Sequence, residues 1–178
     1  MEIVAVRHAT TPYNEQHLIN GMYDEPLSAA GMAQIPALIG SLEGYSLTVV
    51  YCSALLRARR TALPIAEHFG VPLVEDDRIT EVDFGSFAGQ SWDSTIPYFG
   101  VNSSGVLNTY TYDLRPFGGE CADDTRNRVR SFVDDLRANP QALPLLVCHG
   151  GILRWLYHLY SDERRQHIAN ATVHHFTL

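Results

Sequence analysis

The sequence predicts an α/β fold with a mainly parallel sheet, and two patterns indicate it. Short apolar runs rich in β-branched residues stand at positions 2–6, 47–51 and 144–148, which is typical of strands buried on both faces. Segments with apolar residues at helical spacing follow these runs, so strands and helices alternate along the chain. With 178 residues, we expect one domain over residues 1–178.

The helices are predicted from capping signals and apolar periodicity. Ser28 is a good N-cap for a helix reaching position 42, in which Pro36 predicts a bend or a late start. A second helix over 54–69 ends at Gly70, and a strand is expected at 72–75. Two more helices are expected, from Asp123 or Asp124 to 138 and over 151–160. Residues 84–119 show little periodicity beyond a short helix near 91–99, so we expect a loop or lid there.

Composition excludes several classes of protein. The formal net charge is −7 and the pI is near 5.5, which argues against nucleic acid as a partner because that binding relies on clustered Lys and Arg. No run approaches the roughly 18 apolar residues of a membrane span. Arg7 is the only Lys or Arg among the first 56 residues, so it is a candidate anion ligand.

The cysteines and the N-terminus predict a cytoplasmic protein. Cys52, Cys121 and Cys148 are odd in number, widely spaced, and without the Cys/His spacing that binds zinc, which favours a reducing compartment. The first residues run directly into a strand-like segment, with no basic and long apolar stretch of a signal peptide.

Polar residues follow three of the predicted strands. Arg7 and His8 follow the first, Arg57 lies four residues after Ser53 at the second, and His149 with Gly150 follows the 144–148 strand. Ligands of open α/β sheets bind beyond the carboxyl ends of strands. Arginine and the N–H groups of a helix N-terminus suit a phosphate, so we expect a phosphate site there.

The sequence resembles the histidine phosphatase superfamily, in its phosphoglycerate mutase-like branch. Five motifs carry the resemblance in the family's order: Val6-Arg7-His8-Ala9-Thr10-Thr11 with Asn14, Gly21 and 24–28; 53–62; 81–89; Gly118-Gly119-Glu120; and Cys148-His149-Gly150-Gly151-Ile152-Leu153-Arg154. They run from residue 3 to at least 154. The resemblance implies a three-layer α/β/α sandwich and catalysis through a phosphohistidine, without a metal or cofactor.

The resemblance also implies roles for individual residues. His8 would be the nucleophile, while Arg7, Arg57 and His149 would bind the phosphoryl oxygens. Glu81 would protonate the leaving oxygen and later activate water, with Glu75 and Asp76, Asp77 and Asp83 as rival carboxylates. Four further positions match the phosphate or substrate pocket: Asn14, Asn20, Gly21 and Gly150.

The chain departs from the family pattern at a few positions. The usual Gly-Glu after the nucleophile is Ala9-Thr10, and the usual Trp-Glu of the third motif is Phe87-Ala88. Asn20 stands where the mutases usually carry Thr, and Cys121 where Ser often follows Gly-Gly-Glu. None of these is a matched catalytic position, but they set this chain apart from the best-known members.

The favoured function is a phosphatase acting on a small-molecule phosphate monoester. The family's mutases are longer and carry basic residues between the third and fourth motifs, whereas residues 90–114 contain no Lys or Arg. A mutase and a catalytically silent phosphate-binding protein remain alternatives. The substrate is left open among a sugar phosphate, a nucleotide, α-ribazole phosphate and a phosphoprotein. Two further questions are left open. The aromatic residues of 90–114 either contact a substrate or pack the lid onto the core, and a homodimer could form through an edge strand or through the 151–160 helix.

Overall fold

A five-stranded sheet forms the centre of the structure. The computed structural model describes residues 1–101, 107–108, 110–140, 142–163, 165 and 167–178. The strand order is β3-β2-β6-β1-β7, in which the first four strands are parallel and β7 runs antiparallel to β1. The mainly parallel sheet is therefore confirmed. The strands are β1 (Glu2–Arg7), β2 (Val49–Cys52), β3 (Leu73–Glu75), β6 (Pro144–Cys148) and β7 (Val173–Thr177).

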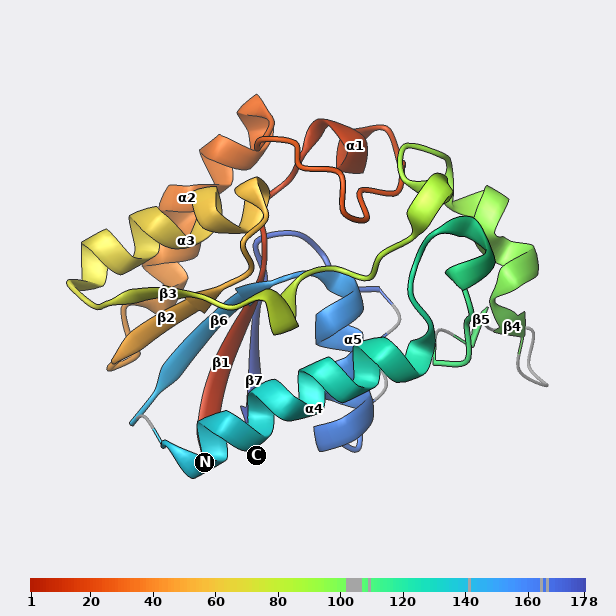
Figure 1. Ribbon diagram of the computed structural model, residues 1–178. Coiled ribbons are helices and arrows are strands. Elements are labelled where there is room, and N and C mark those ends of the chain that lie inside the picture. The colour runs from red at the N-terminus through yellow and green to blue at the C-terminus, as the bar shows by residue number, and fades with distance from the viewer. Residues whose placement is uncertain (102–106, 109, 141, 164, 166) are drawn as a thin grey trace.

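Two helices cover each face of the sheet. α2 (Ala29–Leu42) and α3 (Leu56–Phe69) lie on one face, and α4 (Ala122–Ala138) and α5 (Gly150–Tyr160) lie on the other (Figure 1). β1 shows why the layers form. Its side chains alternate, so Val4 and Val6 pack toward α2 and α3, while Ile3 and Ala5 pack toward α4 and α5.

The predicted helix boundaries agree with the structure within two residues, with one correction. α2 does not start late, because it begins at Ala29 directly after the Ser28 cap, whose Oγ accepts from Gly31 N–H at 3.1 Å, and it continues through Pro36. Gly31 also sets the fold, since a Cβ there would stand 2.0 Å from the Thr10 carbonyl oxygen. Only glycine lets α2 come this close to the loop after β1.

Short elements occupy the segment between β3 and α4. These are 3-10 helices at Asp77–Ile79, Gly85–Phe87, Trp92–Tyr98 and Arg115–Phe117, with a two-stranded pair β4 (Gly100–Val101) and β5 (Leu107–Asn108). The short helix expected near 91–99 is thus a 3-10 helix. Residues 102–106 and 109 of the expected lid lie outside the described residues. Among the described helices, none is long and apolar enough to cross a membrane.

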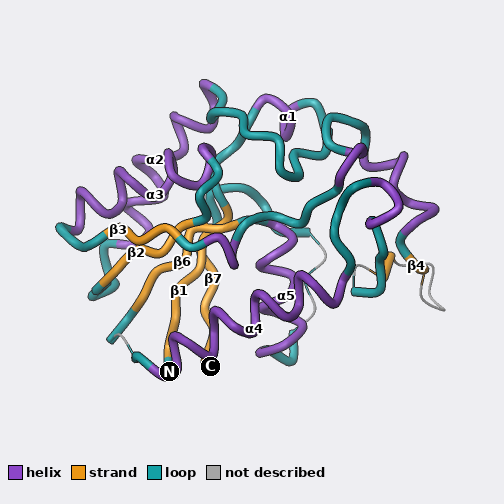
Figure 2. The backbone as a smooth tube through the Cα atoms, viewed as in Figure 1, coloured by secondary structure: helices purple, strands orange, loops and turns teal. Residues whose placement is uncertain are grey.

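The topology creates a crevice where β1 and β6 lie side by side. α2, the first long helix after β1, covers one face, whereas α5 follows β6 on the other face. The two connections diverge from neighbouring strand ends, and this is the place where open α/β sheets bind ligands. Figure 2 shows α1 (Pro12–Glu15) above the sheet, on the side away from the two termini.

Candidate active site

His8 lies directly after β1, and its backbone fixes it against β6 through a hydrogen bond from His8 N–H to Cys148 O of 2.9 Å. Its ring is buried, and Nδ1 lies 2.8 Å from the Ala9 carbonyl oxygen. A carbonyl only accepts, so Nδ1 carries the proton and Nε2 keeps its lone pair. Burial lowers the pKa of His8 well below 6.5, and Arg57 and Arg7 lower it further. The ring is therefore neutral, and its tautomer is fixed with Nε2 unprotonated.

His149 follows β6 and faces His8, with ring centroids 5.1 Å apart. It is fully buried, and burial lowers its pKa well below 6.5, with Arg57 and His8 acting in the same direction. Neither ring nitrogen has a hydrogen-bond partner among the described residues. His149 is thus a neutral imidazole and not a cation. Its one N–H can donate a hydrogen bond to a ligand.

Arg57 lies in the first turn of α3 and is fully buried. Its guanidinium donates to the carbonyls of Gly21 at 2.7 Å and Tyr23 at 2.9 Å. Gly21 has φ +49°, a left-handed conformation that glycine adopts without strain, and its carbonyl reaches Arg57. Arg57 Nε is buried without a partner in the described part of the chain. The loop around Gly21 therefore aims Arg57, and its Nε can donate to an anion.

Arg7 is the last residue of β1 and reaches the loop before β7. Its Nη1 donates to the Ile168 carbonyl, while Nε is buried and lacks a partner among described atoms. Burial lowers the pKa of Arg7 to about 10, with Glu81 opposing and Arg154 and Arg57 adding to the decrease. Arg7 stays charged at neutral pH, at the cost of desolvation, and this cost is offset when an anion binds.

Glu81 lies at the N-terminus of α5. Its carboxylate accepts from Gly151 N–H at 3.1 Å and from Val82 N–H at 2.9 Å. A Cβ on Gly151 would stand 2.3 Å from Glu81 Oε1, so this contact requires glycine. Two of the rival carboxylates are paired elsewhere, since Glu75 binds Arg59 and Asp76 binds Arg78. Glu81 is the carboxylate that the fold places beside the strand ends.

Arg128 of α4 supports Glu81, and the sequence did not single it out. Its guanidinium donates to the backbone carbonyls of Thr80 at 2.5 Å and Glu81 at 3.1 Å. Glu120 of the fourth motif holds this guanidinium at 2.7 Å and also accepts from Asp83 N–H at 2.9 Å. The ion pair thereby fixes the backbone that carries Glu81. The one sequence signal that pointed to this support was the fourth motif, which contains Glu120, the partner of Arg128.

Asn170 is a second supporting residue that sequence reasoning missed. Its Nδ2 donates to the His8 carbonyl at 2.9 Å and to Asn14 Oδ1 at 3.0 Å. Asn14 Oδ1 also accepts from Thr11 N–H at 3.2 Å, which closes a capping box at α1. Asn20 is buried and accepts from the Thr11 hydroxyl at 2.9 Å. The three asparagines therefore brace the loop that carries His8.

A cavity of about 570 Å³ opens beside these residues, and we call it the site cavity. Four predicted residues line it, namely Arg7, Asn14, Glu81 and Gly150. The other predicted residues lie outside its described lining: His8, Arg57, His149, Asn20 and Gly21. The remaining described lining consists of Thr10, His17, Leu18, Gln34, Trp92, Arg154, His167, Ile168, Ala169 and Asn170.

The aromatic residues of 90–114 lie in three different places. Trp92 lines the site cavity and packs edge-on against Phe84, with ring centroids 5.2 Å apart. Phe99 and Tyr112 are buried in the core, 5.4 Å from each other. Tyr98 packs on the outside against Phe117. Of these residues, Trp92 is the one the structure places in the cavity wall.

Comparisons with known proteins identify the family of the chain. The model of the histidine phosphatase superfamily (branch 1) matches residues 3–178. A putative phosphoserine phosphatase 2 of Hydrogenobacter thermophilus is 32% identical over 149 residues, covering 83% of this chain and 72% of the relative. A probable phosphoglycerate mutase of Escherichia coli is 32% identical over 179 residues, covering 97% of this chain and 83% of the relative.

Two solved structures share the fold. A protein of Thermus thermophilus has a TM-score of 0.79 and 30% identity, with 98% of this chain and 92% of the other covered. A mycobacterial glucosyl-3-phosphoglycerate phosphatase in complex with VO3 has a TM-score of 0.82 and 25% identity, with 98% and 90% covered. The chain belongs to branch 1 of the histidine phosphatase superfamily.

Proposed function

We propose that the protein hydrolyses a small-molecule phosphate monoester through a phosphohistidine on His8, without a metal. One observation carries this proposal: three residues around His8 have buried nitrogens with no partner among the described atoms. They are Arg7 Nε, Arg57 Nε and both ring nitrogens of His149. Buried donors without partners are rare and destabilising, so several converging on one imidazole favour an anionic ligand.

The nucleophile is His8 Nε2. Because Nδ1 donates to the Ala9 carbonyl, the Nε2 lone pair attacks phosphorus and the bond between phosphorus and the ester oxygen breaks. Water then attacks the phosphohistidine, the N–P bond breaks, and phosphate leaves while Nε2 regains its lone pair. The lowered pKa of His8 keeps the ring neutral and reactive throughout the physiological range.

Arg7, Arg57 and His149 stabilise the negative charge of the transferring phosphoryl group. Each donates from a buried nitrogen, where an electrostatic interaction is stronger than in water. Arg57 is fixed by two backbone carbonyls, so its donors need no reorganisation during the reaction. Gly150 adds a backbone N–H at the start of α5 with no side chain in the way.

Glu81 is the proposed general acid and base. It lines the site cavity beside Gly150. It delivers a proton to the ester oxygen as the alcohol leaves, and it takes a proton from the attacking water in the second step. Asn14 braces the loop and faces the cavity, so we assign it to the substrate end of the phosphate site. Asn20 and Gly21 contribute by holding Thr11 and Arg57.

The central test is direct trapping of the intermediate. The protein is mixed with a ³²P-labelled aryl phosphate in the presence of EDTA and quenched with alkali within milliseconds to seconds. The expected label is acid-labile, maps to His8, and is absent in His8→Ala. The control His68→Ala removes an exposed histidine of α3 and retains the label. Label on a serine or on His149 alone, or a reaction abolished by EDTA, would refute the proposal.

A mutase reaction is the second candidate, because mutases are among the relatives. It would use the same phosphohistidine but return the phosphoryl group to a second hydroxyl. The discriminating experiment supplies 3-phosphoglycerate with its bisphosphate primer and follows the 2-isomer and inorganic phosphate together. We expect phosphate release to dominate. Efficient isomer formation with little phosphate would replace the phosphatase assignment.

We also propose that the protein acts in the cytoplasm. All three cysteines are free, and two of them are buried. Burial raises the pKa of Cys52 to about 11, so its thiol resists oxidation. A homodimer remains a proposal to be tested by analytical ultracentrifugation. Sedimentation at the mass of one chain, 19.9 kDa, would exclude the dimer.

A further inference from the structure

Two peptide groups in the loop after β1 determine how the His8 ring is held. The first joins His8 to Ala9, and the second joins Ala9 to Thr10. The carbonyl of the second peptide is the acceptor for His8 Nδ1, at 2.8 Å. Ala9 is fully buried, so the polar groups on either side of it need partners within the protein.

Gln34 of α2 holds the peptide between Ala9 and Thr10. Its Oε1 accepts from Thr10 N–H at 2.9 Å. Gly31 makes this contact possible, because it lets α2 pack against the Thr10 backbone, and Gln34 lies one turn further along on the same face of the helix. The N–H and C=O groups of a trans peptide point in opposite directions. The bond to Gln34 therefore keeps the Ala9 carbonyl turned toward the His8 ring.

Thr61 of α3 holds the peptide between His8 and Ala9. Its buried hydroxyl accepts from Ala9 N–H at 3.0 Å and donates to the Arg57 carbonyl at 2.8 Å. The carbonyl of the same peptide, at His8, accepts from Asn170 at 2.9 Å. One hydroxyl thus joins the loop that carries His8 to the helical turn that carries Arg57, and both ends of the peptide are fixed.

The orientation of the peptide between Ala9 and Thr10 decides which ring nitrogen of His8 is protonated. If this peptide were reversed, an N–H group would lie beside the ring in place of the carbonyl. Nδ1 would then have to accept a hydrogen bond, and the ring proton would belong to Nε2. In that tautomer Nε2 has no lone pair with which to attack phosphorus. Correct orientation of one peptide is therefore a condition for catalysis.

We propose that Gln34 and Thr61 are positioning residues for His8, which set its tautomer and its place beside Arg57 by clamping the two peptides that flank Ala9. The inference rests on the proposed role of His8 as the nucleophile. Gln34 fixes the carbonyl that accepts from Nδ1, and Thr61 fixes the loop against α3. Both residues act through the backbone of the loop.

The first test measures the tautomer directly. In protein with ¹⁵N-labelled histidine, the ring nitrogen signals distinguish a protonated Nδ1 from a protonated Nε2, and His8→Ala identifies the signals of His8. Wild type should show a protonated Nδ1 at neutral pH. Gln34→Leu removes the acceptor for Thr10 N–H, so the His8 signals should shift toward those of the Nε2-protonated form. Gln34→Glu keeps an acceptor and should retain the wild-type signals.

The second test measures how fast the phosphohistidine forms from p-nitrophenyl phosphate in a single turnover. Thr61→Val keeps the shape of the side chain but removes the hydroxyl, and we expect the rate at saturating substrate to fall about tenfold to one-hundredfold. Thr61→Ser keeps the hydroxyl and should stay within about threefold of wild type. If Thr61→Val does not fold, Thr61→Cys replaces it, because a thiol is a weak acceptor, and the rate should fall in the same direction.

Thr125→Val on α4 is the matched control. Thr125 is also a buried helical threonine, and its hydroxyl contacts the carbonyl four residues earlier, at Cys121, and the Tyr112 hydroxyl. Thermal unfolding should show a loss of stability in Thr125→Val and in Thr61→Val. The rate of phosphohistidine formation in Thr125→Val should stay within about twofold of wild type.

The outcomes separate this inference from the proposed function. If wild type forms no phosphohistidine, the phosphatase function fails, whereas the ¹⁵N signals still report whether Gln34 sets the tautomer. An unchanged His8 tautomer in Gln34→Leu would overturn the role of Gln34. A rate loss in Thr61→Ser or Thr125→Val as large as that in Thr61→Val would show that Thr61 contributes to stability alone.

Discussion

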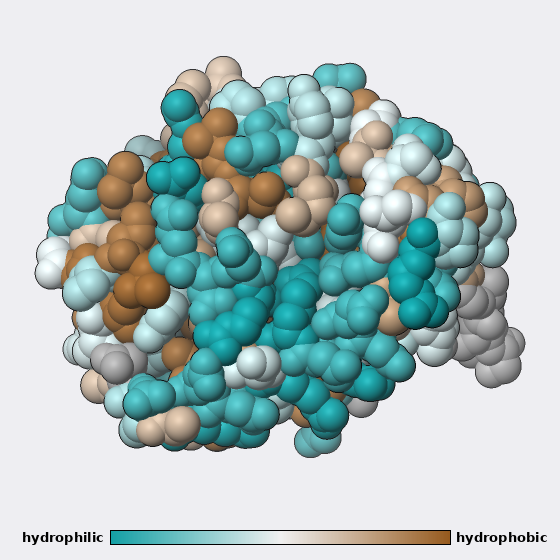
Figure 3. Space-filling view, viewed as in Figure 1, coloured by the Kyte–Doolittle hydropathy of each residue, from teal (hydrophilic) through white to brown (hydrophobic). Residues whose placement is uncertain are grey.

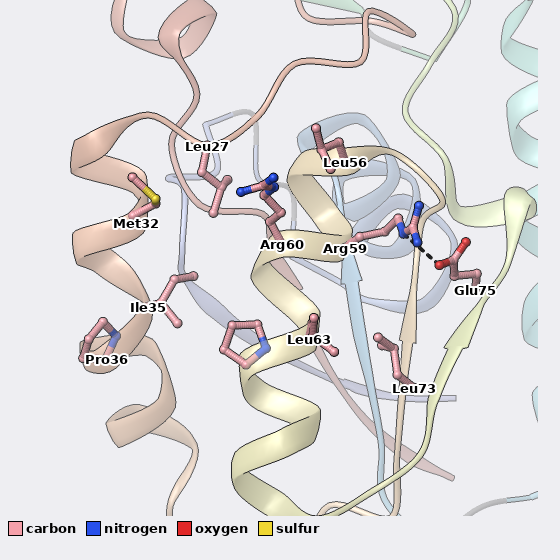
Figure 4. A pocket seen from close by; sticks show the side chains of 11 residues that line it. Leu27, Met32, Ile35, Pro36, Leu56, Arg59, Arg60, Leu63, Leu73 and Glu75 are labelled. Atoms are coloured by element: carbon pink, nitrogen blue, oxygen red, sulfur yellow. Dashed lines mark ion pairs between the residues drawn. The ribbon is translucent and has the colours of Figure 1, made fainter.

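The site cavity and a second cavity between α2 and α3 differ in what lines them. We call the second one the α2–α3 groove. Its volume is about 740 Å³, larger than the site cavity, and its wall is mostly apolar (Figure 4). Its lining residues are Leu27, Met32, Ile35, Pro36, Leu56, Arg59, Arg60, Leu63, Pro64, Leu73 and Glu75. In Figure 3, hydrophobic residues gather on the side where Figure 1 places α2 and α3.

The charged groups of the two cavities show which one carries chemistry. In the groove, Arg59 and Glu75 form an ion pair of 2.8 Å with each other, and both side chains are about half exposed. At the site cavity, Arg7 and Glu81 are partly buried and Arg57 behind them is fully buried, and several nitrogens have no partner among the described atoms. Volume therefore does not identify the active site. The cluster of buried nitrogens without a described partner around His8 favours the site cavity, because the desolvation of such donors is offset when a ligand binds.

The largest expected difference in kcat is between two variants that each remove a carboxylate, one from each cavity. Glu81→Gln removes the proposed acid, so we expect kcat for an alkyl phosphate to fall about 10³-fold. For p-nitrophenyl phosphate the decrease should be smaller, because its leaving group needs little protonation. Glu75→Gln, the matched change in the groove, should leave kcat within about twofold. Steady-state kinetics with both esters measures this, and equal losses for both esters would remove Glu81 from the acid role.

Two arginines of α3 give the next comparison. Arg57→Gln removes a buried donor of the phosphoryl site, and we expect kcat/KM to fall about 100-fold, which corresponds to about 2.7 kcal/mol. Arg59→Gln, two residues along the helix, removes only an exposed ion pair, so its kcat/KM should stay within about twofold. Circular dichroism spectra check that both variants fold. Similar activity losses in the two variants would contradict the assignment of Arg57.

Residues at the ends of parallel strands were predictable from the sequence because topology forces them together. Arg7, Arg57 and His149 lie far apart in the chain, yet each follows or ends a strand of one parallel sheet, so their meeting needs only the strand order. Nδ1 of His8 also has a local acceptor, the carbonyl of the next residue, Ala9. The local pattern was sufficient for these features.

The supporting residues were not predictable, since their contacts depend on long-range packing. β7 contains two histidines between apolar residues and forms only as an antiparallel edge strand against β1. Asn170, in the loop before β7, therefore had no predicted neighbour, although it donates to the His8 carbonyl across 162 positions of sequence. Arg128 likewise looked like one of several surface arginines on α4. A single sequence shows which residues can bind, but not which distant residue holds them in place.

Acid pH should destabilise the site side of the molecule. The folded-state pKa values of His8 and His149 are well below 6.5, and that of His174 is about 4, in each case mainly because of burial. The unfolded state therefore binds more protons below pH 6.5, and stability is lost as the pH falls toward the folded values.

We expect these three histidines to decrease the free energy of unfolding by about 3 kcal/mol between pH 6.5 and 5.5, or about 1 kcal/mol for each. Urea denaturation in phosphate-free buffer measures this. His8→Ala should reduce the decrease by about 1 kcal/mol. An unchanged decrease in that variant would mean that His8 is not neutral in the folded protein.

Two helical glycines test the contact between α5 and Glu81. Gly151→Ala places a Cβ against Glu81 Oε1, so the carboxylate must move, and we expect kcat to fall about tenfold. Gly40→Ala on α2 meets nothing within 4 Å, so it should retain kcat and stabilise the protein by about 0.5 to 1 kcal/mol. Thermal unfolding and alkyl phosphate kinetics give both readouts. Full activity of Gly151→Ala would show that Glu81 acts without this fixed position.

Substitutions of apolar residues in the groove are expected to have the smallest effect on stability and on kcat/KM. Leu63 of α3 and Met32 of α2 both line the groove, and the two residues are 48% and 55% exposed (Figure 4). Their apolar area is already largely in water, so Leu63→Gln and Met32→Gln should each change stability by less than about 0.5 kcal/mol. Because the groove holds no buried unpaired donor among its described residues, kcat/KM should stay within about twofold. A tenfold loss in either variant would mean that the groove communicates with the site cavity, and the distinction between the two cavities would no longer hold.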